Sequence, residues 1–133
     1  MSVFLFPSSG VYGTADSAIV VEPSDPAVLD FNSMPKESVR VGEQVMISVS
    51  LKNWNQSNVS FTTIIEVREL SGVTESLFWQ SATLKEDRER TIAVSWIPRE
   101  EGVFELRTFC LSGLTDERRV YSIVHSSELA ISR

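Results

Sequence analysis

Cysteine and histidine are almost absent from this sequence of 133 residues, which has one of each, Cys110 and His125. A single cysteine cannot form an intrachain disulfide, so the bridge that joins the two layers of antibody domains is excluded. A blue-copper centre needs two histidines and a cysteine, and structural zinc sites need several such ligands. We therefore predict that the chain holds no metal and no cofactor.

Basic residues are also scarce, with 12 Lys and Arg against 18 Asp and Glu, a formal net charge of −6 and a pI of about 4.8. Affinity for nucleic acid comes largely from Lys and Arg that displace counterions from phosphates, so we predict no nucleic-acid partner. No apolar run approaches the roughly 20 residues of a transmembrane helix, so no membrane span is expected within this chain. The opening Met1–Pro7 is too short for a secretory signal, and we expect the signal or anchor of an exported protein to lie outside this sequence.

Catalytic motifs are missing as well. No G-x-S-x-G elbow accompanies His125, and no D-x-D-x-D-G calcium loop occurs. We interpret His125 as an ordinary strand residue and Cys110 as a small buried hydrophobic residue. The sequence therefore predicts that the protein is not an enzyme.

The most informative stretch that is present runs from Thr91 to Leu106. Apolar residues alternate with small or polar ones up to Trp96, a charged turn follows from Pro98 to Gly102, and a second alternation begins at Phe104. A period of two is typical of a strand with one buried face. Two such strands that point Trp96 and Phe104 into one interior predict a β-sandwich.

Further strand patterns follow one another at regular spacing from residue 27 onward, and no segment has a convincing helical period. The expected strands are Val28–Ser33 with Val39–Val41 as its continuation, Val45–Leu51, Phe61–Arg68, Val73–Gln80 after a hairpin turn at Ser71-Gly72, the two strands of Thr91–Leu106, and a last strand from Arg119 to about Ile131. Residues 27–133 are thus predicted to be one all-β domain, an Ig-like antiparallel β-sandwich of seven to eight strands.

Residues 1–26 differ in composition and are predicted to be an extended N-terminal arm or linker. Glycine, serine and proline interrupt two short apolar runs in this segment. The residues of these runs are candidates for strand donation to a neighbouring sheet: Val3, Phe4, Leu5, Phe6, Ala18, Ile19, Val20 and Val21. Docking of the arm on its own domain is the alternative, and the sequence leaves both open.

Two N-x-S sequons begin at Asn55 and Asn58 in one predicted loop, which makes both asparagines glycosylation candidates and favours an extracellular location. Trp54 and Trp79 are candidates for stacking on sugar rings, which would make the protein a carbohydrate-binding module. We favour the simpler interpretation, in which Trp79 packs in the core beside Leu77 and Trp54 covers a loop.

The sequence resembles the Ig-like or CARDB-like repeat modules of archaeal cell-surface proteins, most closely those of ammonia-oxidising archaea. The resemblance covers roughly Ala27 to Val124. It rests on Val41-Gly42-Glu43-Gln44-Val45-x-Ile47 followed by Asn53, on Ser71-Gly72-Val73-Thr74, on Ser95-Trp96-x-Pro98, and on Gly102-x-Phe104-x-Leu106-x-Thr108-Phe109. It implies a structural or adhesive module at the cell surface, with no catalytic residues.

These observations lead to two expectations for function. The first is a non-enzymatic structural or interaction module of an extracellular surface assembly, with other copies of itself or neighbouring domains as partners and with strand donation as a way to form a filament. The second is a carbohydrate-binding module with a glycan as its ligand.

Overall fold

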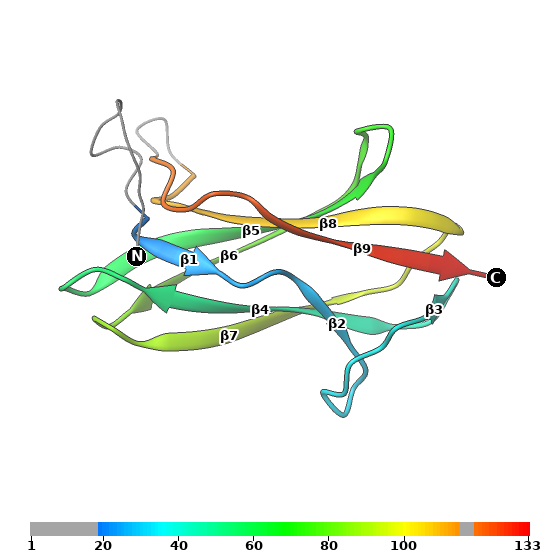
Figure 1. The fold of residues 1–133 in the computed structure, drawn as a ribbon, viewed down its shortest axis with the longest axis horizontal. Helices are drawn as coiled ribbons and strands as arrows, with labels where there is room; N and C mark the ends of the chain where they lie inside the picture. Colours follow the sequence, from blue (N-terminus) through cyan, green and yellow to red (C-terminus); the bar gives the residue numbers. More distant parts are fainter. Residues whose placement is uncertain (1–18, 115–118) are drawn as a thin grey trace.

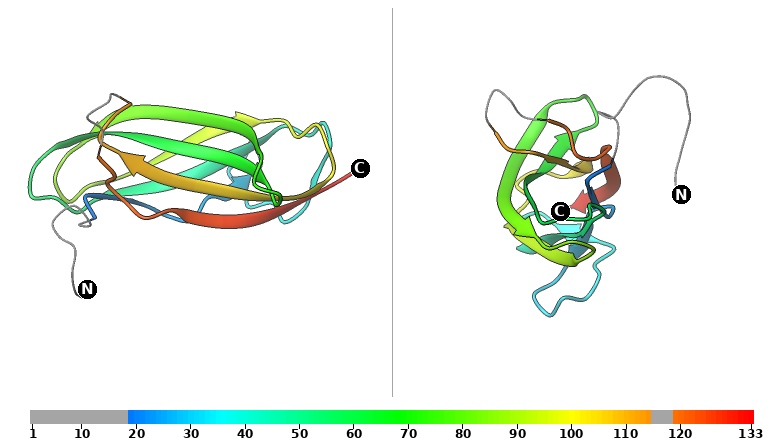
Figure 2. Two further views of the ribbon diagram at one scale, coloured as in Figure 1. Left: turned by 90° about the horizontal axis from the view of Figure 1, so that it is seen from above. Right: turned by 90° about the vertical axis from the view of Figure 1, so that its left-hand side faces the viewer.

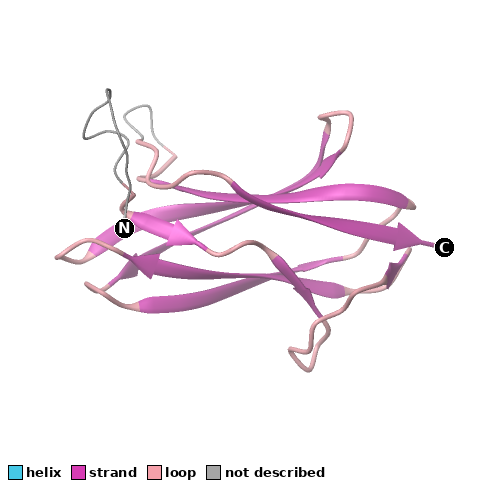
Figure 3. Ribbon diagram, viewed as in Figure 1, coloured by secondary structure: helices cyan, strands magenta, loops and turns pink. Residues whose placement is uncertain are grey.

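The computed structural model describes residues 19–114 and 119–133, which form a sandwich of two β-sheets elongated along its strands (Figures 1 and 2). The described residues contain no helix, and so none that could cross a membrane (Figure 3). The strands are β1 (Val21–Pro23), β2 (Ala27–Leu29), β3 (Val39–Arg40), β4 (Val45–Asn53), β5 (Val59–Glu69), β6 (Thr74–Leu84), β7 (Glu89–Trp96), β8 (Gly102–Leu111) and β9 (His125–Ser132). The predicted all-β sandwich is confirmed.

The first sheet is built around β4, the strand with the cleanest alternation in the sequence. Along one edge β4 pairs antiparallel with the whole of β7, from Val45 opposite Trp96 to Lys52 opposite Glu89. Along the other edge it pairs first with β2 and then with β1. Odd-numbered residues of β4 are buried and face the second sheet, as the period of two predicts.

The second sheet has the strand order β3-β9-β8-β5-β6, and only the β3–β9 pair is parallel. The expectation that residues 39–41 continue the first strand is therefore wrong. The chain leaves the first sheet after Leu29, where the Asp30 carboxylate accepts hydrogen bonds from the backbone N–H groups of Asn32 and Met34 and forms a turn. Beyond this turn, β3 joins the opposite sheet beside Ile131.

The core lies between the sheets and takes apolar side chains from both. Its fully buried large residues include Ile47, Leu51, Ile65 and Leu106. Trp96 at the end of β7 and Phe104 near the start of β8 face each other from opposite sheets, with ring centroids 6.3 Å apart and ring planes at 75°. This edge-to-face contact confirms the predicted shared interior and fixes the corner between the two strands.

The described part of the predicted arm begins at Ile19, and residues 1–18, with Val3–Phe6 and Ala18, lie outside the described residues. Val21 is fully buried, and its strand β1 pairs with the end of β4, so the first sheet of the sandwich already includes residues 21–23. In this structure the C-terminal part of the second apolar run thus packs on its own chain.

Asn53 joins the two sheets at one end of the sandwich. Its side chain is fully buried, and Nδ2 lies 3.0 Å from each of the carbonyl oxygens of Ser57, Leu84 and Lys85. Its Oδ1 accepts a hydrogen bond from the backbone N–H of Asn55. Asn53 ends β4 and Leu84 ends β6, so one amide satisfies backbone groups from both layers.

We predict that Asn53→Ala lowers the free energy of unfolding by about 2–4 kcal/mol, because it removes the partner of the buried Leu84 carbonyl, of two part-buried carbonyls and of one N–H. Asn53→Asp should cost a similar amount, since a carboxylate cannot donate to the three carbonyls. Exposed Asn58 provides the matched control, and Asn58→Ala should change stability by less than about 0.5 kcal/mol. Urea unfolding of the three variants measures these differences, and equal stability of Asn53→Ala and the parent chain would contradict the assigned role.

Candidate functional site

One long side of the sandwich, here called the closed side, is sealed by contacts between the β1–β2 segment and β9. Nδ1 of His125 lies 3.2 Å from Oδ1 of Asp25. The hydroxyl of Ser127 donates a hydrogen bond of 2.7 Å to the carbonyl oxygen of Pro26. At the C-terminal end of β9, the chain crosses from β2 in one layer to β3 in the other (Figure 1). His125 is the first residue of β9, and its contact with Asp25 helps to hold the two layers together.

The opposite long side, here called the open side, is bordered by two strands that each have a single partner. Among the described strands, β6 pairs only with β5, and β7 pairs only with β4. The backbone N–H and C=O groups along their outer edges thus have no partner strand within residues 19–114 and 119–133. A groove of about 500 Å³ lies between these edges and is lined by Glu75, Ser76, Phe78, Ser95, Trp96, Ile97 and Arg99.

Trp79 and Leu77 project from the outer face of the second sheet, with 59% and 51% of their surfaces exposed. The interpretation that Trp79 packs in the core beside Leu77 is therefore wrong. Every second residue of β6 faces inward, and the inward set contains Phe78, which is half-buried against the core. Both faces of this strand carry large apolar residues, so alternation alone could not decide which face is buried.

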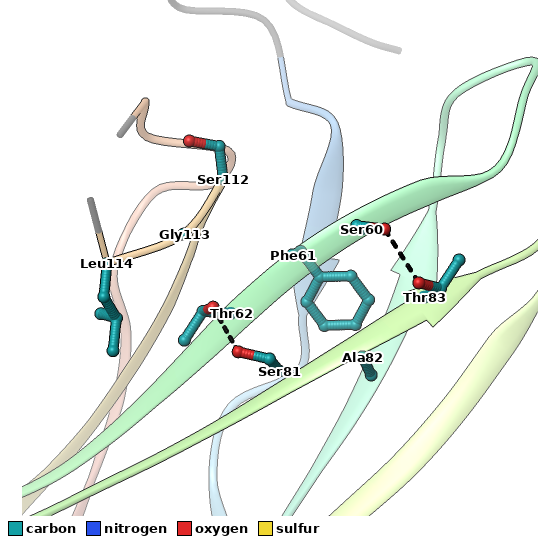
Figure 4. Close-up of a pocket in the computed structure, with 9 residues that line it drawn as sticks. All are labelled: Ser60, Phe61, Thr62, Ser81, Ala82, Thr83, Ser112, Gly113 and Leu114. Atoms are coloured by element: carbon teal, nitrogen blue, oxygen red, sulfur yellow. Dashed lines mark hydrogen bonds between the residues drawn. The ribbon is translucent and has the colours of Figure 1, made fainter. Parts of the chain in front are cut away.

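A row of hydroxyl groups continues this outer face beyond Trp79. Ser60 and Thr83 are 2.8 Å apart at their hydroxyl oxygens, and Thr62 and Ser81 are 2.7 Å apart. They border a shallow hollow of about 460 Å³ whose lining is Ser60, Phe61, Thr62, Ser81, Ala82, Thr83, Ser112, Gly113 and Leu114 (Figure 4). Sequence reasoning missed this row, although Ser and Thr at 60, 62, 81 and 83 repeat with the period of a strand.

Trp54 lies on the outer face of the other sheet and is 56% exposed. Its Nε1–H donates a hydrogen bond of 3.0 Å to Glu22, and the Lys52 ammonium lies 5.3 Å from the centre of its ring. Glu22 and Lys52 are paired on the outward face of the first sheet. The structure thus places Trp54 and Trp79 on opposite faces of the sandwich and does not bring them together.

Both sequon asparagines are exposed. Asn55 and Asn58 lie in the short connection between β4 and β5, which projects at one end of the sandwich (Figure 1). A glycan attached to either would extend into solvent rather than into the core.

Reactive groups are few in the described residues. No cluster of three or more His, Cys, Asp or Glu side chains that could hold a metal ion occurs there. Cys110 is fully buried on β8, as predicted, and burial raises the pKa of its thiol to about 11. The hydroxyls of Thr63 and Ser122 lower this pKa only in part. A thiol in this setting contributes to packing and has little nucleophilic thiolate.

A scan of protein-family models and a search of curated proteins give no match. Among solved structures, the chain is similar to the CARDB domain of the PF1109 protein from Pyrococcus furiosus in complex with di-metal ions, with a TM-score of 0.55 and 16% identity over 85% of this chain and 91% of that one. It is also similar to the C-terminal domain of Wzt, with a TM-score of 0.68 and 12% identity over 88% and 76%. A third similarity, to a β-glucosidase from Listeria innocua in complex with isofagomine, has a TM-score of 0.59 and 12% identity over 92% of this chain but only 17% of the enzyme. The CARDB-like fold is confirmed, and at these identities the likeness establishes the fold alone.

We predict that Cys110 does not react with a disulfide reagent such as dithionitrobenzoate at pH 8 in the folded protein and reacts fully in denaturant.

The raised pKa of Cys110 also makes the stability depend on pH, because the unfolded thiol ionises near its ordinary value of 9.0 and the folded thiol near 11. Stability from this group is complete below pH 9 and is lost as the pH rises from 9 to 11. Cys110→Ala is the control, and it should lack this decline. Rapid labelling of the native protein would contradict the burial.

Proposed function

We propose that this protein is a non-enzymatic structural and interaction module of an extracellular surface assembly, whose copies are joined by donation of an N-terminal strand. The observation that carries this proposal is the contrast between the closed and the open side of the sandwich. Within residues 19–114 and 119–133, side-chain contacts and the crossing to β3 bridge one side, whereas β6 and β7 end the other side without partner strands. An extended peptide can satisfy such edges with main-chain hydrogen bonds.

The N-terminal sequence supplies a peptide of suitable character. Val3–Phe6 is a run of four apolar residues that ends at Pro7, which cannot donate a ladder hydrogen bond. Twelve residues, 7–18, separate this run from the first described residue. Fully extended, they span about 40 Å, enough to reach a second molecule placed end to end with the first.

The surface location is part of the same proposal. The two exposed sequons at Asn55 and Asn58 and the resemblance to archaeal surface modules support it. The partners would be further copies of this chain or neighbouring domains of a surface protein.

We predict that removal of residues 1–18 abolishes assembly while leaving the fold intact. The truncation stops before Val21, because this residue is buried in the first sheet. Light scattering coupled to size-exclusion chromatography should give oligomers for the full chain and monomers for the truncated chain. Circular dichroism of the truncated chain should match that of the parent, and its thermal unfolding should match that of the parent diluted to single chains, because assembly itself raises the apparent stability. A full chain that is monomeric, or whose mass the truncation leaves unchanged, would contradict the proposal.

A second candidate function is glycan binding, and the exposure of Trp79 favours it. An exposed indole beside a row of hydroxyls offers a stacking surface and hydrogen-bonding groups for a sugar ring. Because Trp54 lies on the opposite face, this site would depend on Trp79 alone.

Tryptophan fluorescence titrated with oligosaccharides of several linkage types tests this candidate. We predict that Trp79→Ala removes any saturable change in fluorescence and that Trp54→Ala retains it. Both residues are more than half exposed, so the two variants form a matched pair with small effects on the fold. Absence of a saturable change in the parent chain with every sugar tested would exclude glycan binding at this face.

A further inference from the structure

We infer that the donated strand is accepted by β6, at the edge formed by residues 76–84, and that its occupant is residues 3–6 of a second copy of this chain. This inference rests on the proposed strand donation and identifies where on the acceptor it takes place. The open side offers two candidate edges, β6 and β7, and four features of the structure distinguish them.

The first feature is the absence of the usual protection along β6. Natural sheets shield exposed edges with lysine, proline, inward charges, bulges or very short strands. The nine residues from Ser76 to Leu84 contain no charged residue, no proline and no glycine, in a chain of which 23% is charged. So long an uncharged free edge would be an aggregation hazard unless a partner strand covers it.

The second feature is the position of the only irregularity in β6. The register with β5 shifts between Val67 and Arg68, which pair with Ser76 and Thr74 and leave Glu75 unpaired. A bulge of this kind bends the strand and ends regular pairing at that point. It protects only the start of β6, so the regular edge begins at Ser76.

The third feature is that β7 is better protected. Its first two residues, Glu89 and Arg90, are exposed and charged, and the strand is eight residues long against eleven for β6. Beyond Trp96, Pro98 prevents regular extension of the edge. Fewer backbone groups are thus available to a partner along β7 than along β6.

The fourth feature is the groove beside β6, which suits an apolar strand. Alternate side chains of a strand added to β6 would lie over the inner face, where half-buried Phe78 borders the groove and Ile97 is 47% exposed. Two of the four residues of Val3–Phe6 would cover these side chains. The donor segment, residues 3–6, and the acceptor edge, residues 76–84, both lack charged side chains, and none precedes Asp16 in the sequence. No charge would therefore be buried when the two strands pair.

A pair of matched variants tests which edge accepts the strand. Leu77→Lys with Trp79→Lys places two lysines on the outer face of β6, and Thr91→Lys with Ala93→Lys does the same on β7, at positions that do not line the groove. All four positions are exposed, and each pair changes the net charge by the same amount. We expect the β6 variant to lose every species larger than one chain and the β7 variant to assemble like the parent. Loss in the β7 variant alone, or in neither variant, would overturn the assignment to β6.

A mixing experiment establishes that the occupant comes from a second copy. One chain keeps its arm and carries the two lysines on β6, and the other has an intact β6 but lacks residues 1–18. Each should be monomeric alone, and together they should form a one-to-one pair. If both stay monomeric when mixed and truncation lowers the melting temperature, the arm docks on its own domain and the inference is wrong.

These outcomes separate the inference from the proposal on which it rests. Failure of strand donation itself would appear as assembly that truncation of residues 1–18 does not affect. Failure of the β6 assignment would appear as assembly that needs the arm but tolerates the lysines at positions 77 and 79. Circular dichroism of each variant confirms that a loss of assembly does not reflect unfolding.

Discussion

Every strand at the border of a sheet carries backbone N–H and C=O groups that need partners, and this requirement governs the surface of the sandwich. The apolar core holds the two sheets face to face, but its side chains cannot supply hydrogen-bond partners for the backbone groups of the edge strands. On the closed side, β3 crosses from one layer to the other, and Ser127 and His125 on β9 contact the β1–β2 segment. On the open side, no other part of the described chain pairs with the outer edges of β6 and β7. The proposed function follows from this difference between the two sides.

Much of the fold could be predicted from the sequence, wherever one face of a strand is apolar and the other polar. The alternation in β4 and the contact between Trp96 and Phe104 are examples. The burial of a strand was predicted wrongly where both of its faces are apolar, as at Leu77, Phe78 and Trp79 in β6. Alternation does not show which face of such a strand is buried. It also gave no sign that residues 39–41 change sheets, since that depends on long-range pairing with β9 rather than on local pattern.

The candidate site was less predictable than the fold, because an edge is defined by which strands fail to pair. Periodicity identifies strands but not their neighbours in the sheet. The exposure of Trp79 and the separation of Trp54 from it likewise depend on which layer each strand joins. Asn53 could be predicted only in part. The sequence places a polar residue at the end of an apolar strand, but only the structure shows that its side chain donates hydrogen bonds to the carbonyls of Leu84 and Lys85. Proteins of many functions share the β-sandwich fold, so the function of this protein depends on its surfaces.

Hydrogen exchange of the backbone amides of β6, followed by mass spectrometry, tests whether this edge accepts a donated strand. The comparison is between the assembled full chain and the chain that lacks residues 1–18. If β6 accepts a donated strand, amides within residues 76–84 exchange more slowly in the assembly, whereas amides of β7 are unchanged. Equal exchange of residues 76–84 in the two chains would show that no strand is added to β6.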